Sequence, residues 1–173
     1  MIKTDIFDEI INCGISSEDT ILQLGVGYKN GSLLYKLCEY WDLNSTEINK
    51  IIGLDIDPNK TESLSEIFSN IQFVKNSMQE YLDTVENNSF NWCILTGVFD
   101  KYLYDDLQHN FVFKTVNRCL ELSENGVVFT LKVNVSDEFS YNPVFIFADF
   151  VNTHSTVFVK KLENNTYVFC ILK

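Results

Sequence analysis

A glycine turn near the start of the chain has the residue types and the spacing that suit ligand binding. An apolar run at residues 21–24 leads into Gly25-Val26-Gly27, and an apolar pattern with helical spacing begins at Leu33. Glycine lets the backbone bend and approach a ligand closely, because no Cβ atom stands in the way. A strand, a glycine turn and a helix in this order bring backbone amides and a helix N-terminus to one place, where a ligand can bind.

Two carboxylates follow the next apolar run. Residues 50–57 are predicted to form a strand that carries Asp55 and Asp57 at its end. Pro58 is expected to end this strand, because proline cannot donate to a strand ladder. The pair of carboxylates is either part of a binding site or an ordinary strand exit, and both interpretations stay open on these residues alone.

The rest of the chain alternates predicted helices and strands. Helices are expected at 5–13, 32–40, 61–69, 78–85, 105–121 and 143–151, and strands at 20–25, 50–57, 71–74, 90–95, 127–133, 156–162 and 166–172. Gly14 and Glu124-Asn125-Gly126 are expected to end helices. The pattern predicts one α/β domain over residues 1–173, with an N-terminal helix and lead-in at 1–19. Its sheet is expected to be doubly wound, mostly parallel and seven-stranded, with helices on both faces and a C-terminal antiparallel hairpin.

The predicted sheet also locates the site. Ligands of such sheets bind at the carboxyl ends of the strands, beside the point where the strand order reverses. The loops expected to form the site are therefore 25–31, 55–59, 75–79 and 96–102.

Composition and charge narrow the class of protein. The chain has 173 residues, of which 46% are hydrophobic and 14% aromatic, as expected for a packed globular protein. Its formal net charge of −11 disfavours nucleic acid as a partner, because an acidic surface repels phosphates. No stretch has the composition of a signal peptide or the length of a membrane span, so we expect a soluble, cytoplasmic protein without membrane contact.

Cysteine and histidine usage predicts neither disulfides nor a metal site. The chain contains five cysteines, namely Cys13, Cys38, Cys93, Cys119 and Cys170. Their odd number, their wide spacing and the lack of a Cys-x-x-Cys motif indicate small buried side chains in a reducing compartment. The two histidines, His109 and His154, stand far apart, and no zinc-binding pattern includes them.

The order of these features resembles the class I (Rossmann-like) S-adenosylmethionine-dependent methyltransferases. The shared features are the glycine turn after the first strand, the acid that ends the second strand and the closing hairpin, and they cover roughly residues 20–173. The resemblance implies an enzyme that binds S-adenosyl-L-methionine and releases S-adenosyl-L-homocysteine. It also implies a small-molecule or protein acceptor for the methyl group.

The resemblance assigns cofactor-binding roles to the ends of the first two strands. Gly25, Gly27 and Asn30 fall in the turn after the first strand, and Gln23 stands where the family has an acid. The amide of Gln23 can still hydrogen-bond to the methionine moiety or order the loop, but it offers an ammonium group no charge attraction. Asp55 takes the place of the acid that binds both ribose hydroxyls, since two carboxylate oxygens can accept from a vicinal diol.

The resemblance places the adenine ring beside three further residues. Ile56 is expected to lie against the ring. Ser77 replaces an acid that often accepts from the adenine amino group, so that contact is expected to weaken or to move to the backbone. Met78 either flanks the adenine or fills the core.

The loop after the fourth predicted strand is expected to pass beneath the sulfonium and to lead into the acceptor site. Thr96 and Gly97 begin this loop, and Asp100 and Tyr102 are its polar candidates for taking a proton from the acceptor. Both can instead serve only to cap or flank the next helix. The acceptor pocket is expected to form from the N-terminal helix and the loops 100–106 and 134–143, with a second subunit of a homodimer as a further contributor.

Two other functions fit part of the pattern. A non-catalytic module that keeps the fold and the nucleoside pocket would explain Gln23 and Ser77 in place of acids. A nicotinamide-dependent oxidoreductase would also use Gly25-x-Gly27 and a later acid. Against the latter, position 30 is Asn where the dinucleotide fingerprint has Gly or Ala, and the closing hairpin fits the methyltransferase topology better.

Overall fold

Seven strands form one sheet in the computed structural model, which describes residues 5–27, 33–41, 50–68, 71–99, 106–133, 143–154, 156–163 and 165–173. They are β1 (Ile21–Leu24), β2 (Ile51–Asp55), β3 (Gln72–Lys75), β4 (Phe90–Leu95), β5 (Ser123–Lys132), β6 (Thr156–Lys161) and β7 (Thr166–Leu172). The strand order is β3-β2-β1-β4-β5-β7-β6. β7 runs antiparallel to both β5 and β6, as the predicted C-terminal hairpin requires.

The strand order reverses at β1. This strand pairs in parallel with β2 on one side and with β4 on the other. In doubly wound sheets the carboxyl ends of the strands beside such a reversal form the ligand-binding crevice. The predicted doubly wound, mostly parallel sheet is therefore confirmed, and its reversal point lies next to the glycine turn.

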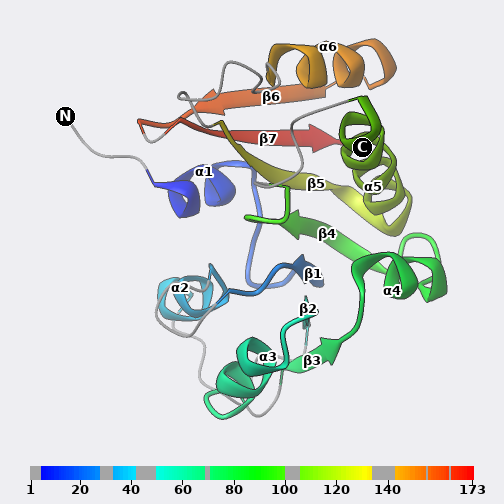
Figure 1. Ribbon diagram of the computed structural model, residues 1–173. Coiled ribbons are helices and arrows are strands. Elements are labelled where there is room, and N and C mark those ends of the chain that lie inside the picture. Colours follow the sequence, from blue (N-terminus) through cyan, green and yellow to red (C-terminus); the bar gives the residue numbers. More distant parts are fainter. Residues whose placement is uncertain are drawn as a thin grey trace.

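Helices cover both faces of the sheet (Figure 1). They are α1 (Ile6–Asn12), α2 (Leu33–Tyr40), α3 (Pro58–Ser65), α4 (Met78–Thr84), α5 (Asp106–Leu122) and α6 (Pro143–Thr153). Side chains of a strand alternate between its two faces, so residues of β1 belong to two hydrophobic cores, one on each face of the sheet. Leu22 and Leu24 pack with residues of α4, α5 and α6, whereas Ile21 packs with residues of α1, α2 and α3.

The sequence prediction was wrong about the start of α3. Residues 61–69 were expected to form this helix, but it begins at Pro58 and ends at Ser65. The Oδ1 atom of Asp57 accepts a hydrogen bond from the backbone N–H of Asn59 at 3.0 Å and so caps the helix. Proline is favoured in the first turn of a helix because its missing N–H is not needed there. Pro58 therefore opens α3, whereas β2 already ends at Asp55.

The prediction was also wrong about the segment between α5 and β5. Glu124-Asn125-Gly126 was expected to end the helix, but α5 stops at Leu122 and the strand begins at once at Ser123. Gly126 lies inside β5, where an added Cβ atom would stand 2.3 Å from the backbone oxygen of Ile171. Glycine is needed there for the close approach of β7, and not to terminate the helix. The bounds of the other predicted elements agree with the observed ones to within two residues.

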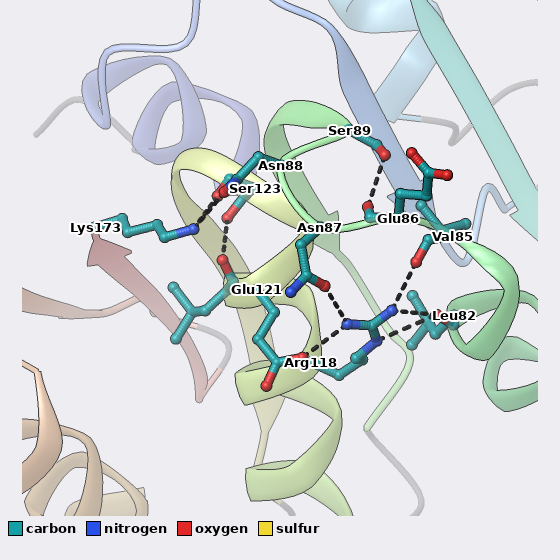
Figure 2. A network of polar contacts seen from close by, with 11 residues as sticks. Leu82, Val85, Glu86, Asn87, Asn88, Ser89, Arg118, Glu121, Ser123 and Lys173 are labelled. Atoms are coloured by element: carbon teal, nitrogen blue, oxygen red, sulfur yellow. Dashed lines mark hydrogen bonds and ion pairs between the residues drawn. The ribbon is translucent and has the colours of Figure 1, made fainter.

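A polar network lies at the end of the sheet where β4 begins (Figure 2). The guanidinium of Arg118, on α5, donates to the backbone oxygens of Leu82 and Val85 at the end of α4, and to the Oδ1 atom of Asn87 at 2.6 Å. These bonds join α4, the turn that follows it and α5. Because α5 runs back from the carboxyl end of β4, the network lies at the amino-terminal end of β4. The glycine turn lies at the opposite end of the strands.

The described residues contain no helix with the length and apolar character that a membrane crossing requires. Within the same part of the chain, no three histidine, cysteine or acidic side chains gather as they would around a metal ion. All five cysteines are free thiols, and four of them are buried.

Candidate functional site

A cavity of about 450 Å³ lies at the carboxyl ends of β1, β2, β3 and β4. Each of the four loops predicted to form the site contributes to its wall. The contributing residues include Gly25, Asp55, Ile56, Asn76, Met78 and Gly97. We call this space the first cavity. The fold thus brings together segments that are more than seventy positions apart in the sequence.

Asp55 is the buried acid of the first cavity. It is the last residue of β2, and its side chain is 5% exposed. Its Oδ1 atom accepts a hydrogen bond from the backbone N–H of Asp57 at 3.0 Å. The Nζ atom of Lys60, on α3, lies 3.3 Å from Oδ2 and 3.4 Å from Oδ1, and Lys60 also lines the cavity. The lysine offsets a charge that burial would otherwise leave uncompensated.

Glycines bring the turn after β1 against the loop after β4. Gly25, Gly27 and Gly97 have φ values of +77°, +72° and +67°, in the region that glycine adopts most readily. A Cβ atom on Gly25 would stand 2.8 Å from the backbone oxygen of Thr96 and 2.9 Å from a methyl group of Val98. The close contact of the two loops therefore depends on glycine.

A buried hydroxyl group positions the loop after β4. The backbone N–H of Gly97 donates to the Oγ1 atom of Thr130, on β5, at 3.0 Å. Thr130 is 2% exposed, so its side chain is fixed by the packing around it. The bond anchors the loop to the body of the sheet.

A second cavity of about 260 Å³ lies on the other side of Gly25 and Gly97, which line both spaces. Its wall includes Gly27 and Thr96, together with residues of α1 and α2. The two cavities are therefore adjacent and share these two glycines in their walls. A ligand that reached from one cavity to the other would lie against both loops.

The residues expected beside the adenine ring do line the first cavity. Ile56 is 71% exposed at its rim, where an apolar ring could cover it. Met78 begins α4 and packs partly against the core. Ser77 caps α4, because its Oγ atom accepts from the backbone N–H of Glu80 at 3.3 Å, while its own N–H donates to the Oδ1 atom of Asn76. The hydroxyl oxygen of Ser77 thus already has a structural role.

Gln23 lies in neither cavity wall. It is 1% exposed, and its register partner Ile94 belongs to the core on the side of α1, α2 and α3. Its amide nitrogen and oxygen have no hydrogen-bond partner among the residues that the structure describes. A buried amide without partners costs stability, so a partner from outside these residues would satisfy it. Its predicted contact with the methionine moiety stays a prediction.

Three of the predicted site residues, Asn30, Asp100 and Tyr102, lie outside the described residues. Their assigned roles, in the glycine turn and in proton transfer, stay predictions.

Sequence reasoning missed several residues of the two walls. Lys60 follows Asp55 by five positions and Asn76 comes directly after β3, so both could have been noticed once α3 was placed correctly. Val98, Phe111 and Lys36 gave no such signal, because apolar residues and surface lysines occur throughout the chain.

No protein-family model and no curated protein matches the sequence. Solved structures nevertheless share the fold. The methyltransferase WbdD, described as a bifunctional kinase-methyltransferase, aligns with a TM-score of 0.68 at 14% identity, over 95% of this chain and 40% of that one. This chain therefore spans less than half the length of that protein.

Two shorter methyltransferases align over almost the whole chain. A Burkholderia thailandensis 1,6-didemethyltoxoflavin-N1-methyltransferase, solved with its namesake compound and S-adenosylhomocysteine, has a TM-score of 0.65 at 13% identity, over 96% of this chain and 76% of that one. The N-methyltransferase NodS of Bradyrhizobium japonicum has a TM-score of 0.63 at 11% identity, over 96% and 93%. The chain thus has the fold of the class I S-adenosylmethionine-dependent methyltransferases.

Proposed function

We propose that the chain binds S-adenosylmethionine in the first cavity and transfers its methyl group to a small-molecule or protein acceptor. Asp55 carries the proposal, because it places a buried carboxylate in the cavity wall at the end of β2. A ribose offers two neighbouring hydroxyl donors, and a carboxylate can accept from both.

The other residues of the first cavity also suit a nucleoside. Ile56 and Met78 offer apolar surface to an adenine ring, and Asn76 offers an amide beside them. Gly25 and Gly97 present backbone without side chains to both cavities, and an added Cβ atom at Gly25 would collide with Thr96 and Val98. These features fit the cofactor that the fold implies.

The bound cofactor would supply a methyl group on a positively charged sulfur: the acceptor would bond to the methyl carbon as the carbon–sulfur bond breaks, and the sulfur would keep the electron pair as a neutral thioether. The chain has to hold the acceptor in line with that methyl group and to keep water away. Asp100 and Tyr102 are proposed to take the acceptor proton where the acceptor carries one. Thr130 holds the loop that carries Gly97 in position for this alignment.

Thermal unfolding with a panel of ligands tests the proposal. A ligand that binds only the native state stabilises it by about 2.7 kcal/mol at a hundred times its Kd, which raises Tm by several degrees. We expect S-adenosylmethionine and S-adenosylhomocysteine to raise Tm, and NAD to leave it unchanged. An unchanged Tm with both S-adenosylmethionine and S-adenosylhomocysteine would contradict the proposal. A rise in Tm with NAD alone would favour an oxidoreductase.

A non-catalytic nucleoside-binding module is the second candidate. It is favoured by the hydroxyl of Ser77, which caps α4 and does not replace the missing acid. The two candidates separate on turnover, measured as S-adenosylhomocysteine released from S-adenosylmethionine in the presence of acceptor mixtures. Tight binding without release in any mixture would favour the module.

A further inference from the structure

The second cavity carries one charge. Its wall is otherwise apolar or backbone, with Ile6 and Phe7 from α1, Leu33 from α2 and Val26 beneath them. Lys36, on α2, is the charged side chain among the described residues of this wall. A lysine beside apolar surface attracts an anionic group, because such a group needs a cation when it leaves water.

Asp5 holds Lys36 when no ligand competes for it. The Nζ atom lies 2.7 Å from the Oδ2 atom of Asp5, and the two side chains are 47% and 51% exposed. Ion pairs this exposed contribute little stability. Burial alone would raise the pKa of Asp5, but Lys36 and the backbone N–H of Asp8 outweigh it and hold the pKa below its ordinary value. Asp5 also caps α1 through Asp8, so it can keep a structural role without the lysine.

Resting on the proposed function, we propose that the second cavity receives the amino acid end of the cofactor and that Lys36 binds its carboxylate. The nucleoside and the amino acid of the cofactor are joined at one sulfur atom. The two cavities are adjacent in the same way, since both walls include Gly25 and Gly97. A nucleoside held by Asp55 in the first cavity would therefore place the amino acid past these two glycines, in the second cavity.

Lys36 also supplies what Gln23 lacks. Gln23 is neutral, buried and absent from both walls, so it does not provide a charge for the amino acid end. Lys36 donates from a flexible ammonium group and exchanges an exposed aspartate for the carboxylate of the ligand. The binding of the cofactor thus releases Asp5, at the start of α1, from α2.

Two ligands separate this subsite from the rest of the site. S-adenosylhomocysteine carries the amino acid, whereas 5′-methylthioadenosine has the same nucleoside and thioether sulfur without it. We expect Lys36→Met to weaken the binding of S-adenosylhomocysteine about tenfold, the effect of losing one charge-assisted bond, and to leave methylthioadenosine within about twofold. Calorimetric titration of the full chain measures both affinities.

Matched variants control for charge and for folding. Lys50→Met removes a lysine of similar exposure, paired with Glu18 at 2.9 Å and absent from both walls, and should change neither affinity. Lys36→Arg keeps the charge and should retain most of the affinity for S-adenosylhomocysteine. Asp5→Asn can still cap α1 and removes the competitor, so it should bind S-adenosylhomocysteine at least as tightly as the parent.

The proposal is overturned if Lys36→Met binds S-adenosylhomocysteine as the parent does, or if both ligands lose affinity equally. A loss of affinity in Asp5→Asn would also contradict it. If the parent chain binds neither ligand, the proposed function itself fails and the carboxylate subsite fails with it.

Discussion

The ion pair of Asp55 and Lys60 sets the conditions under which a ribose can bind. Both Nζ–O distances exceed 3.2 Å, so the lysine compensates the charge of Asp55 without a short bond to either oxygen. The Oδ1 atom has a second partner in the N–H of Asp57, whereas Oδ2 meets only Lys60 among the hydrogen bonds of the described residues. A ligand hydroxyl would therefore approach Oδ2 with the least disturbance.

Thr130 is the residue whose replacement should alter binding without altering the fold. Thr130→Val removes the acceptor that holds the N–H of Gly97, whereas Thr130→Ser keeps it. Gly97 is exposed, so water can satisfy its N–H, and the free energy of unfolding should change by only about 1 kcal/mol. We expect S-adenosylhomocysteine to bind several-fold more weakly to the valine variant in calorimetry. Equal affinities of the valine and serine variants would show that the bond does not position the loop.

The place of a single residue could be predicted where an acid or a glycine stands at the end of a predicted strand. Asp55 and Gly25 stand at such ends, and the structure places both in the cavity wall. Lys36 was not predictable, because its place in a cavity wall depends on how α1 packs beside α2, whereas Lys60 needed only the correct start of α3. The burial of Gln23 was also hidden, since alternation along a four-residue strand does not show which face holds a polar side chain.

At the level of elements, the alternation of apolar periods predicted each helix and strand, but two boundaries depended on local chemistry. Pro58 was expected to end a strand, but β2 ends at Asp55, and Pro58 opens α3, whose first turn Asp57 caps. Gly126 could end a helix or allow a neighbouring strand to approach closely. It does the latter, because β7, which lies far along the sequence, pairs with β5 at this position. The prediction of a boundary fails where a residue can have two local roles and contact with a distant element determines which one it has.

Arg118 should be the main polar tie between α4 and α5. Arg118→Met removes donors to two backbone oxygens and to Asn87, and should lower the free energy of unfolding by about 2 kcal/mol in urea denaturation. Lys114→Met removes an exposed charge from the same helix and should change it by less than about 0.5 kcal/mol. The affinity for S-adenosylhomocysteine should stay within twofold in both variants, because the network lies at the end of the strands opposite the first cavity. Equal stabilities of the two variants would contradict this role.

The whole molecule combines an acidic surface with a cation at each cavity. Its net charge of −11 disfavours polyanions, while Lys60 lines the first cavity and Lys36 the second. S-adenosylmethionine carries a positive sulfonium and a positive ammonium beside one carboxylate. An acidic protein in which one lysine is proposed to bind that carboxylate would suit such a ligand better than a dinucleotide, whose phosphates are negative.

The affinity of S-adenosylhomocysteine for the parent chain, Asp55→Asn and Asp57→Asn tests the central claim most directly. Asparagine at position 55 keeps the size of the side chain but loses the charge that would strengthen the two proposed bonds to the ribose. At position 57, asparagine still caps α3. Calorimetry should find one site in the parent, an affinity at least about tenfold weaker in Asp55→Asn and a change within twofold in Asp57→Asn. Equal binding by the parent and Asp55→Asn, or no binding by the parent, would contradict the account.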